Sequence, residues 1–208
     1  MLLNGCWFER LISFMDFEGA AMALLDEEQE DALHELLHET TSLYMRIIDK
    51  ACECYDLDGI CLHDDWGSQM APFFSEESAR KFFLPEMKRM ADHIHSKNMY
   101  FELHSCGHVA KRCNIFVEAG VDAWDPMAMN DCDWLYKEYG EKLILGMVNP
   151  NPPAPDATEE EQRTAAREFA QKYCKPGVPV AYSSFYNPPM SAVFAEELYK
   201  VSREIYGG

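Results

Sequence analysis

The sequence predicts an α/β protein, a TIM-barrel-like (β/α)8 fold that lacks its two or three N-terminal β/α units. Apolar runs rich in strand formers alternate with amphipathic segments, and short turns such as EAGVD and EYGEK separate them, as in parallel βαβ units. Polar residues follow the strands, where a barrel builds its active site. No GxGxxG or Walker pattern follows a strand, so nucleotide-binding versions of the alternative, an open doubly wound sheet, lose support.

The elements of the first half follow from periodicity and capping residues. A strand is expected near residues 1–6, and residues 27–55 carry apolar side chains at helical spacing, which predicts one long amphipathic helix. LDGICLHDDWGS, residues 57–68, is typical of a strand followed by a polar loop. Ser75 is placed to cap the next helix, and Pro85 should kink or restart it.

The second half continues the alternation. Thr158 and Glu161 form the capping box of a helix that runs to about Tyr173, and KPG ends it. The remaining strands are expected at MYFELHS (99–105), VDAWDPM (121–127), KLILGMV (142–148) and VPVAYSS (178–184), with helices near residues 109–119, 133–139 and 191–205. A full barrel has eight strands and takes about 250 residues, whereas this chain of 208 shows five clear strands and a further one near residues 1–6, so two or three N-terminal units are expected to be missing.

Composition favours a single globular domain over residues 1–208. The chain is 48% hydrophobic, enough for a substantial core. Its formal charge of -18 repels phosphate backbones and anionic lipids, so we expect neither nucleic acid nor a membrane as partner. Charged residues interrupt the apolar N-terminal stretch, and the eight cysteines are too dispersed for a disulfide scaffold. These features predict a cytoplasmic protein with reduced thiols.

Two short patterns suggest metal ligands. The first, His34-Glu35-Leu36-Leu37-His38, matches the HExxH motif of zinc metalloproteases. No further zincin motif accompanies it, and acidic residues surround it as on a solvated helix face, so we favour a structural role.

The second pattern is YFELHSCGHVA, residues 100–110. Residues i and i+2 of a strand project to one face, so His104 and Cys106 can reach the same ion. Zinc suits a mixed imidazole and thiolate set. Glu102 lies on the same face one step deeper, as a ligand, a partner of His104 or a buried charge paired elsewhere. The alternative is a polar strand end without a metal.

HDDWGSQ, HSCGHV, EAGVDAWDPM and LILGMVNP, in this order and spacing, resemble the uroporphyrinogen decarboxylase superfamily over roughly residues 20–205. That superfamily includes the decarboxylase and the cobalamin-dependent methyltransferases. The resemblance implies a (β/α)8 barrel and an enzyme. In the methyltransferase branch a His-x-Cys pair on a strand binds zinc, which His104 and Cys106 match.

The resemblance is closer to the methyltransferases than to the decarboxylases. The decarboxylases hold substrate carboxylates with an N-terminal arginine-rich segment that this chain lacks. The thiol-activating methyltransferases take a third ligand from a cysteine in the last strand's loop, where this chain has Ser183 and Ser184. Glu102, Asp65 or another carboxylate would then complete the zinc site, as carboxylates do in the O-demethylase methyltransferases.

The resemblance and the barrel geometry also suggest roles for neighbouring residues. Asp64 and Asp65 follow a strand, a position typical of catalytic residues in a barrel. One is expected to hydrogen-bond substrate or orient a ligand, while the other caps a turn. Trp66, Gln69 and Tyr186 are assigned to substrate binding, although the two aromatic residues suit a core equally well.

These observations predict a corrinoid-dependent, zinc-assisted methyltransferase that acts on a small methylated compound, with the corrinoid (cobalamin) carried by a partner protein. The first alternative is a decarboxylase of porphyrin biosynthesis. The second is an incomplete barrel without catalysis, stabilised by self-association as a homo-oligomer or by a separate N-terminal partner that covers its open strand edges.

Overall fold

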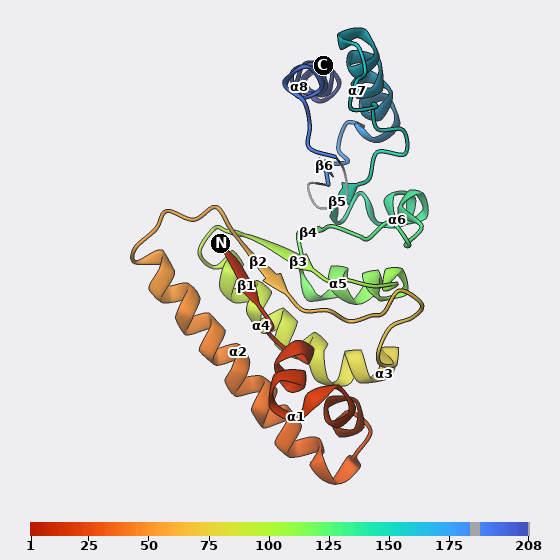
Figure 1. The fold of residues 1–208 in the computed structure, drawn as a ribbon. Helices are drawn as coiled ribbons and strands as arrows, with labels where there is room; N and C mark the ends of the chain where they lie inside the picture. The colour runs from red at the N-terminus through yellow and green to blue at the C-terminus, as the bar shows by residue number, and fades with distance from the viewer. Residues whose placement is uncertain (184–187, 208) are drawn as a thin grey trace. The chain divides into compact units, whose positions relative to one another are not determined.

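The computed structural model describes residues 1–183 and 188–207 and contains six strands that alternate with helices (Figure 1). The strands are β1 (Leu2–Asn4), β2 (Gly59–His63), β3 (Tyr100–His104), β4 (Ala123–Trp124), β5 (Ile144–Met147) and β6 (Val180–Tyr182). All six lie where the sequence predicts a strand, and the α/β class with parallel pairing is confirmed. The closed barrel of eight strands stays a prediction.

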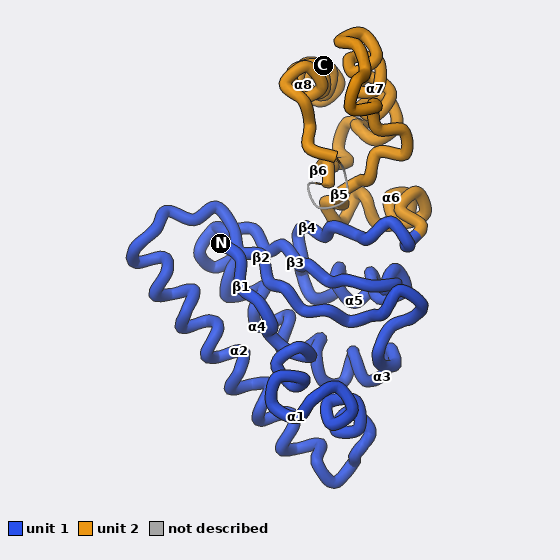
Figure 2. The backbone as a smooth tube through the Cα atoms, in the orientation of Figure 1, with its two compact units in different colours: residues 1–130 blue, residues 131–208 orange. Residues whose placement is uncertain are grey.

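The chain forms two compact units, residues 1–130 and 131–208 (Figure 2). The first holds β1 to β4 and the second holds β5 and β6. Nearly all the candidate residues at strand ends belong to the first unit, so that unit determines the geometry of the site.

In the first unit, β1 to β4 pair in parallel in chain order. Side chains alternate along each strand, so Ile60, Leu62, Phe101 and Leu103 are buried on the face that the helices cover (Figure 1). Glu102, on the opposite face of β3, is only partly buried. The register places His63 opposite His104, which brings the last residues of β2 and β3 side by side.

In the first unit, two α-helices precede β2. The predicted amphipathic helix is observed as a short 3-10 turn, Glu27–Gln29, followed by α2 (Glu30–Cys52). An additional helix, α1 (Phe8–Ala23), was not expected, because non-helical angles at Met15 and Asp16 interrupt it and break its apolar periodicity. Asp16 has a φ of 61°, and its carboxylate accepts a hydrogen bond from Gly19 N, which restarts the helix.

The helix predicted around Pro85 is restarted there. Ser75 caps α3 (Glu76–Ser78), a π-helical turn follows over Ala79–Phe83, and α4 (Leu84–His95) begins with the proline in its first turn. Proline has no N–H to donate, so the chain accommodates it where the regular hydrogen-bond pattern changes. A 3-10 turn (Ala110–Arg112) and α5 (Cys113–Ala119) then lead from β3 to β4.

The second unit contains α6 (Cys132–Tyr139), α7 (Glu159–Tyr173) and α8 (Ala192–Tyr206) around β5 and β6. The capping box of Thr158 and Glu161 is confirmed at the start of α7. Glu197 of α8 is buried and pairs with Arg163 and Arg167 of α7, which joins the two helices. Among the described residues, no helix is both long and apolar enough to cross a bilayer.

Candidate metal centre

Four side chains at the ends of β2 and β3 gather their donor atoms at one point. His63, Asp65, His104 and Cys106 each offer one ligand atom, and these four atoms lie within 4.8 Å of one another. Two imidazoles, one thiol and one carboxylate form a set that suits zinc. We refer to these four residues as the strand-end cluster.

The two histidines occupy equivalent positions on adjacent strands. Because His63 and His104 are paired in the register, their rings stack with centroids 4.3 Å apart and an interplanar angle of 9°. His104 is buried, and that burial, followed by the neighbouring His63, lowers its pKa. His104 is therefore neutral at neutral pH, which is the form of imidazole that binds a metal.

Cys106 and Asp65 complete the cluster from the loops that follow the strands. Cys106 Sγ lies 3.2 Å from His104 Nε2. The Cys106 N–H donates a hydrogen bond of 2.7 Å to Asp65 Oδ1, which ties the loop after β3 to the loop after β2. Asp65 Oδ1 lies 3.7 Å from His63 Nε2, close to the separation of about 3.4 Å between two ligands around tetrahedral zinc.

A contact between two glycines holds these loops together. Gly107 has a φ of 94°, and a Cβ atom there would lie 2.2 Å from the backbone of Gly67. The His108 N–H also donates to the Ser68 carbonyl at 2.7 Å. The glycines of the HDDWGSQ and HSCGHV motifs therefore allow the close backbone approach that brings Asp65 and Cys106 together.

Asp64, the other carboxylate predicted to be catalytic, faces the core. It is fully buried, and its oxygens accept hydrogen bonds from the backbone N–H groups of Trp7, Phe8 and Glu9 and from the Trp66 indole. Burial raises the pKa of Asp64 to about 6, against the effect of these hydrogen bonds. Asp64 thus binds the N-terminus of α1, where a carboxylate is favoured.

The remaining predicted residues lie outside the strand-end cluster. Trp66 is fully buried, packing against Phe74, Phe83 and Phe116, and Gln69 is exposed on the loop after β2. Glu102 is half-buried, with its pKa raised by that burial, and is not one of the four clustered residues. Tyr186 and Ser184 lie outside the described residues, so their roles stay predictions.

The HExxH histidines are each engaged elsewhere. The His34 ring lies 4.9 Å from the Phe82 ring, and His38 contacts Glu86 and Arg89 of α4. Among the described residues, the strand-end cluster is the group found with three or more potential metal ligands, and it does not include these histidines. This arrangement supports the structural role favoured from the sequence.

Two residues of the site were missed as functional candidates in the sequence. His63 was recognised only as a polar residue at a strand end, although two strands that both end in histidine would place the rings together when paired in parallel. Glu9 had no sequence signal, because it reaches His63 from α1, 54 positions away along the chain.

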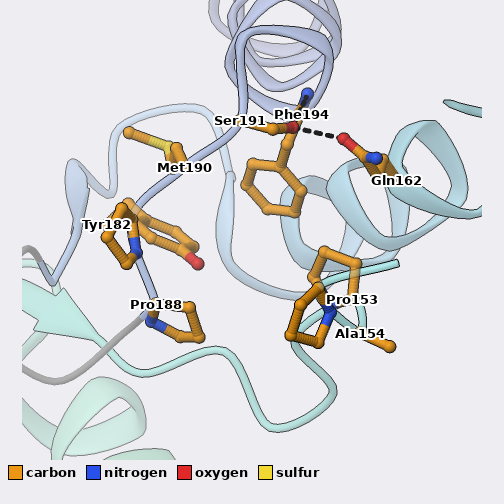
Figure 3. A pocket seen from close by; sticks show the side chains of 10 residues that line it. Pro153, Ala154, Gln162, Tyr182, Pro188, Met190, Ser191 and Phe194 are labelled. Atoms are coloured by element: carbon orange, nitrogen blue, oxygen red, sulfur yellow. Dashed lines mark hydrogen bonds between the residues drawn. The ribbon is translucent and has the colours of Figure 1, made fainter. Parts of the chain in front are cut away.

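A cavity of about 310 Å³ in the second unit offers a different kind of surface (Figure 3). None of the described residues that line it has a charged side chain, and the polar Gln162 and Ser191 hydrogen-bond to each other. The lining consists of Pro153, Ala154, Pro155, Gln162, Tyr182, Pro188, Pro189, Met190, Ser191 and Phe194. The described lining is mainly apolar, so this cavity suits an apolar group.

The fold and the site define an α/β protein with a potential metal centre at the carboxyl ends of parallel strands. The family model described as Uroporphyrinogen decarboxylase (URO-D) matches residues 11–179, and the chain belongs to this family. The suspected resemblance is therefore confirmed.

A solved structure supports the same fold. A methyltransferase from Methanosarcina mazei superposes with a TM-score of 0.61 at 16% sequence identity. The match covers 98% of this chain and 58% of that chain, so the chain spans little more than half of that protein's length. A comparison with curated proteins gave no match.

Proposed function

We propose that this chain is a zinc-dependent methyltransferase of the uroporphyrinogen decarboxylase family. It transfers a methyl group between a small methylated compound and a corrinoid held by a separate protein. The strand-end cluster is the observation on which this proposal rests, because a thiol and two imidazoles converge within 4.8 Å where a strand-and-helix fold builds its active sites. The fold shared with a methyltransferase is consistent with it.

We assign His63, His104 and Cys106 as the zinc ligands. Three protein ligands and one open position are typical of catalytic zinc. Asp65 already accepts the Cys106 N–H, so we assign it to orient Cys106 and to lie beside the open position. Zinc bound there would act as a Lewis acid that lowers the pKa of a coordinated thiol or water.

The first experiment is zinc analysis of the purified full chain, with His104→Ala and Cys106→Ala as variants. We expect one zinc per chain, and a loss of affinity of at least about 100-fold in each variant. His34→Ala is the matched control and should retain zinc, because this histidine lies on α2 with its own partners. An intact protein that binds no zinc would remove the proposed mechanism.

The second experiment measures methyl transfer from methylcobalamin to small thiols and the reverse reaction. A zinc-loaded chain with no transfer to any acceptor would leave the metal centre in place and favour the non-catalytic alternative. In that case we expect a second copy of the chain or a separate partner to cover the open strand edge. Sedimentation would detect self-association of the chain.

Decarboxylation of uroporphyrinogen is the second candidate function, and it is favoured because the family that matches is described as uroporphyrinogen decarboxylase. Against it, the chain carries a formal charge of -18, which disfavours a substrate rich in carboxylates. Incubation of the chain with uroporphyrinogen and analysis of the products decides this point. We expect no turnover.

A further inference from the structure

Glu9 makes a contact that the proposed ligand set does not use. Its carboxylate Oε2 lies 2.9 Å from His63 Nδ1, on the side of the ring opposite to the nitrogen that faces Asp65. The two side chains are 28% and 25% exposed. A partly exposed contact of this kind contributes little to stability, so it calls for another explanation.

The position of Glu9 is fixed by the fold. Asp64 accepts hydrogen bonds of 3.0 Å from the N–H groups of Trp7, Phe8 and Glu9, which docks the first turn of α1 at the end of β2. The next residue, Arg10, donates to the Gly5 carbonyl and to the Tyr44 hydroxyl. Glu9 therefore projects from a backbone that is held on both sides.

The contact determines which nitrogen of His63 is available. When Nδ1–H donates to a carboxylate, Nε2 carries the lone pair. Nε2 lies 3.7 Å from Asp65 Oδ1, too far for a hydrogen bond, and faces the strand-end cluster. A carboxylate that holds the distal N–H of a ligand histidine fixes the ring and increases its basicity toward a metal.

We infer that Glu9 is a positioning residue, the outer carboxylate of the metal centre, which holds His63 in the tautomer and orientation that bind the ion. This inference rests on the proposed function. It also gives α1 a role in the site, because Asp64 binds the N-terminus of the helix that carries Glu9. The sequence separation between Glu9 and His63 makes the contact invisible without the structure.

The test is the zinc dissociation constant of the full chain, measured by competition with a chromophoric chelator, together with the visible spectrum of the Co²⁺ form. We expect Glu9→Ala to weaken zinc binding about 10-fold or more and to shift the Co²⁺ d–d bands. Glu9→Gln keeps an oxygen acceptor for Nδ1–H and should recover most of the affinity. Glu18→Ala, an exposed glutamate on the same helix, should match the wild type.

The same measurement in a His63→Ala background separates positioning from a general effect on folding. There the Glu9 substitution should cause no further loss, because the ring on which it acts is gone. An equal loss in both backgrounds, or unchanged affinity and spectrum in Glu9→Ala, overturns the inference. If Glu9→Ala does not fold, the same comparison is made with Glu9→Met, which also removes the acceptor. A loss that disappears in the His63→Ala background supports the inference, and an unchanged dissociation constant or a loss equal in both backgrounds overturns it.

The zinc measurements on the wild type and on the variants also separate a failure of this inference from a failure of the proposed function. A wild-type chain that binds no zinc removes the proposed function itself. A wild-type chain that binds zinc, beside a variant that lacks the Glu9 acceptor and is indistinguishable from it, removes only the role of Glu9.

Discussion

Asp64 and Asp65 are adjacent in the sequence but have opposite environments at the end of β2. Both follow β2, and their partners differ: Asp64 accepts backbone N–H groups at the start of α1, whereas Asp65 accepts the Cys106 N–H. Asp65 lies 29% exposed in the strand-end cluster, whereas Asp64 is fully buried against α1. The sequence predicts a functional role for the pair, but it does not indicate which of the two carboxylates faces the site.

Removing the Asp64 carboxylate should destabilise the protein. Asp64→Ala leaves three backbone N–H groups and the Trp66 indole without their acceptor, and we expect a loss of about 3 kcal/mol in the free energy of unfolding. Urea denaturation measures it, with the exposed Asp58→Ala as control. A loss below about 1 kcal/mol would contradict the structural role of Asp64.

At the scale of elements, the loops after β2 and β3 depend on the contact between Gly67 and Gly107. Gly107→Ala adds a Cβ atom that overlaps the Gly67 backbone, and it also forces an alanine into a backbone conformation with positive φ. We expect a cost of more than about 2 kcal/mol and weaker zinc binding, because Cys106 is the preceding residue.

Gly177→Ala is the matched control for this substitution. Gly177 has a comparable φ of 78° but nothing within 4 Å of the added atom, so it should cost only about 1 kcal/mol and leave zinc binding unchanged. Urea denaturation and chelator competition measure both variants. Equal costs in the two variants would show that the loop contact is unimportant.

The pair of helices α7 and α8 should show a pH-dependent contribution from Glu197. Hydrogen bonds from Arg167, and then from Arg163, hold the pKa of Glu197 below its usual value of 4.5. The contribution to stability is therefore present above the unfolded pKa and is lost as the pH falls through the folded pKa. We expect Glu197→Gln to lower the melting temperature at pH 7 and to converge with the wild type in acid.

Glu196→Gln provides the comparison for that measurement. Glu196 also pairs with Arg163 but is 71% exposed, so solvent screening should leave its substitution nearly neutral at every pH. A melting temperature of Glu197→Gln that stays below the wild type by the same amount at all pH values would contradict the proposed ion-pair origin.

Local patterns predicted most elements but not α1. Strand formers, the capping box at Thr158 and the proline at position 85 each act within a few residues, so the sequence shows them directly. The interruption at Met15 and Asp16 hides the periodicity of α1. The docking of its N-terminus on Asp64 is a long-range contact that periodicity cannot indicate.

For the whole molecule, the sequence predicted His104 and Cys106 as metal ligands and offered Asp65 as one carboxylate that could complete the site, whereas the structure added His63. His104 and Cys106 were predicted from the i, i+2 spacing of a strand, although β3 ends at His104 and Cys106 lies in the loop after it. His63 depends on the register between two strands, and the assignment of Asp65 depends on the glycine contact between two loops. All four residues lie in the unit formed by residues 1–130, so the metal centre is built from one compact part of the chain.

X-ray absorption spectroscopy at the zinc edge of the zinc-loaded full chain is the most direct test of the assignment of His63, His104 and Cys106 as zinc ligands. It reports the number and kind of atoms bound to the ion. We expect one sulfur from Cys106 and two imidazole nitrogens from His63 and His104, with the remaining coordination from oxygen. The sulfur should disappear in Cys106→Ala. A zinc shell that contains no sulfur, or one whose sulfur persists in that variant, would contradict this assignment.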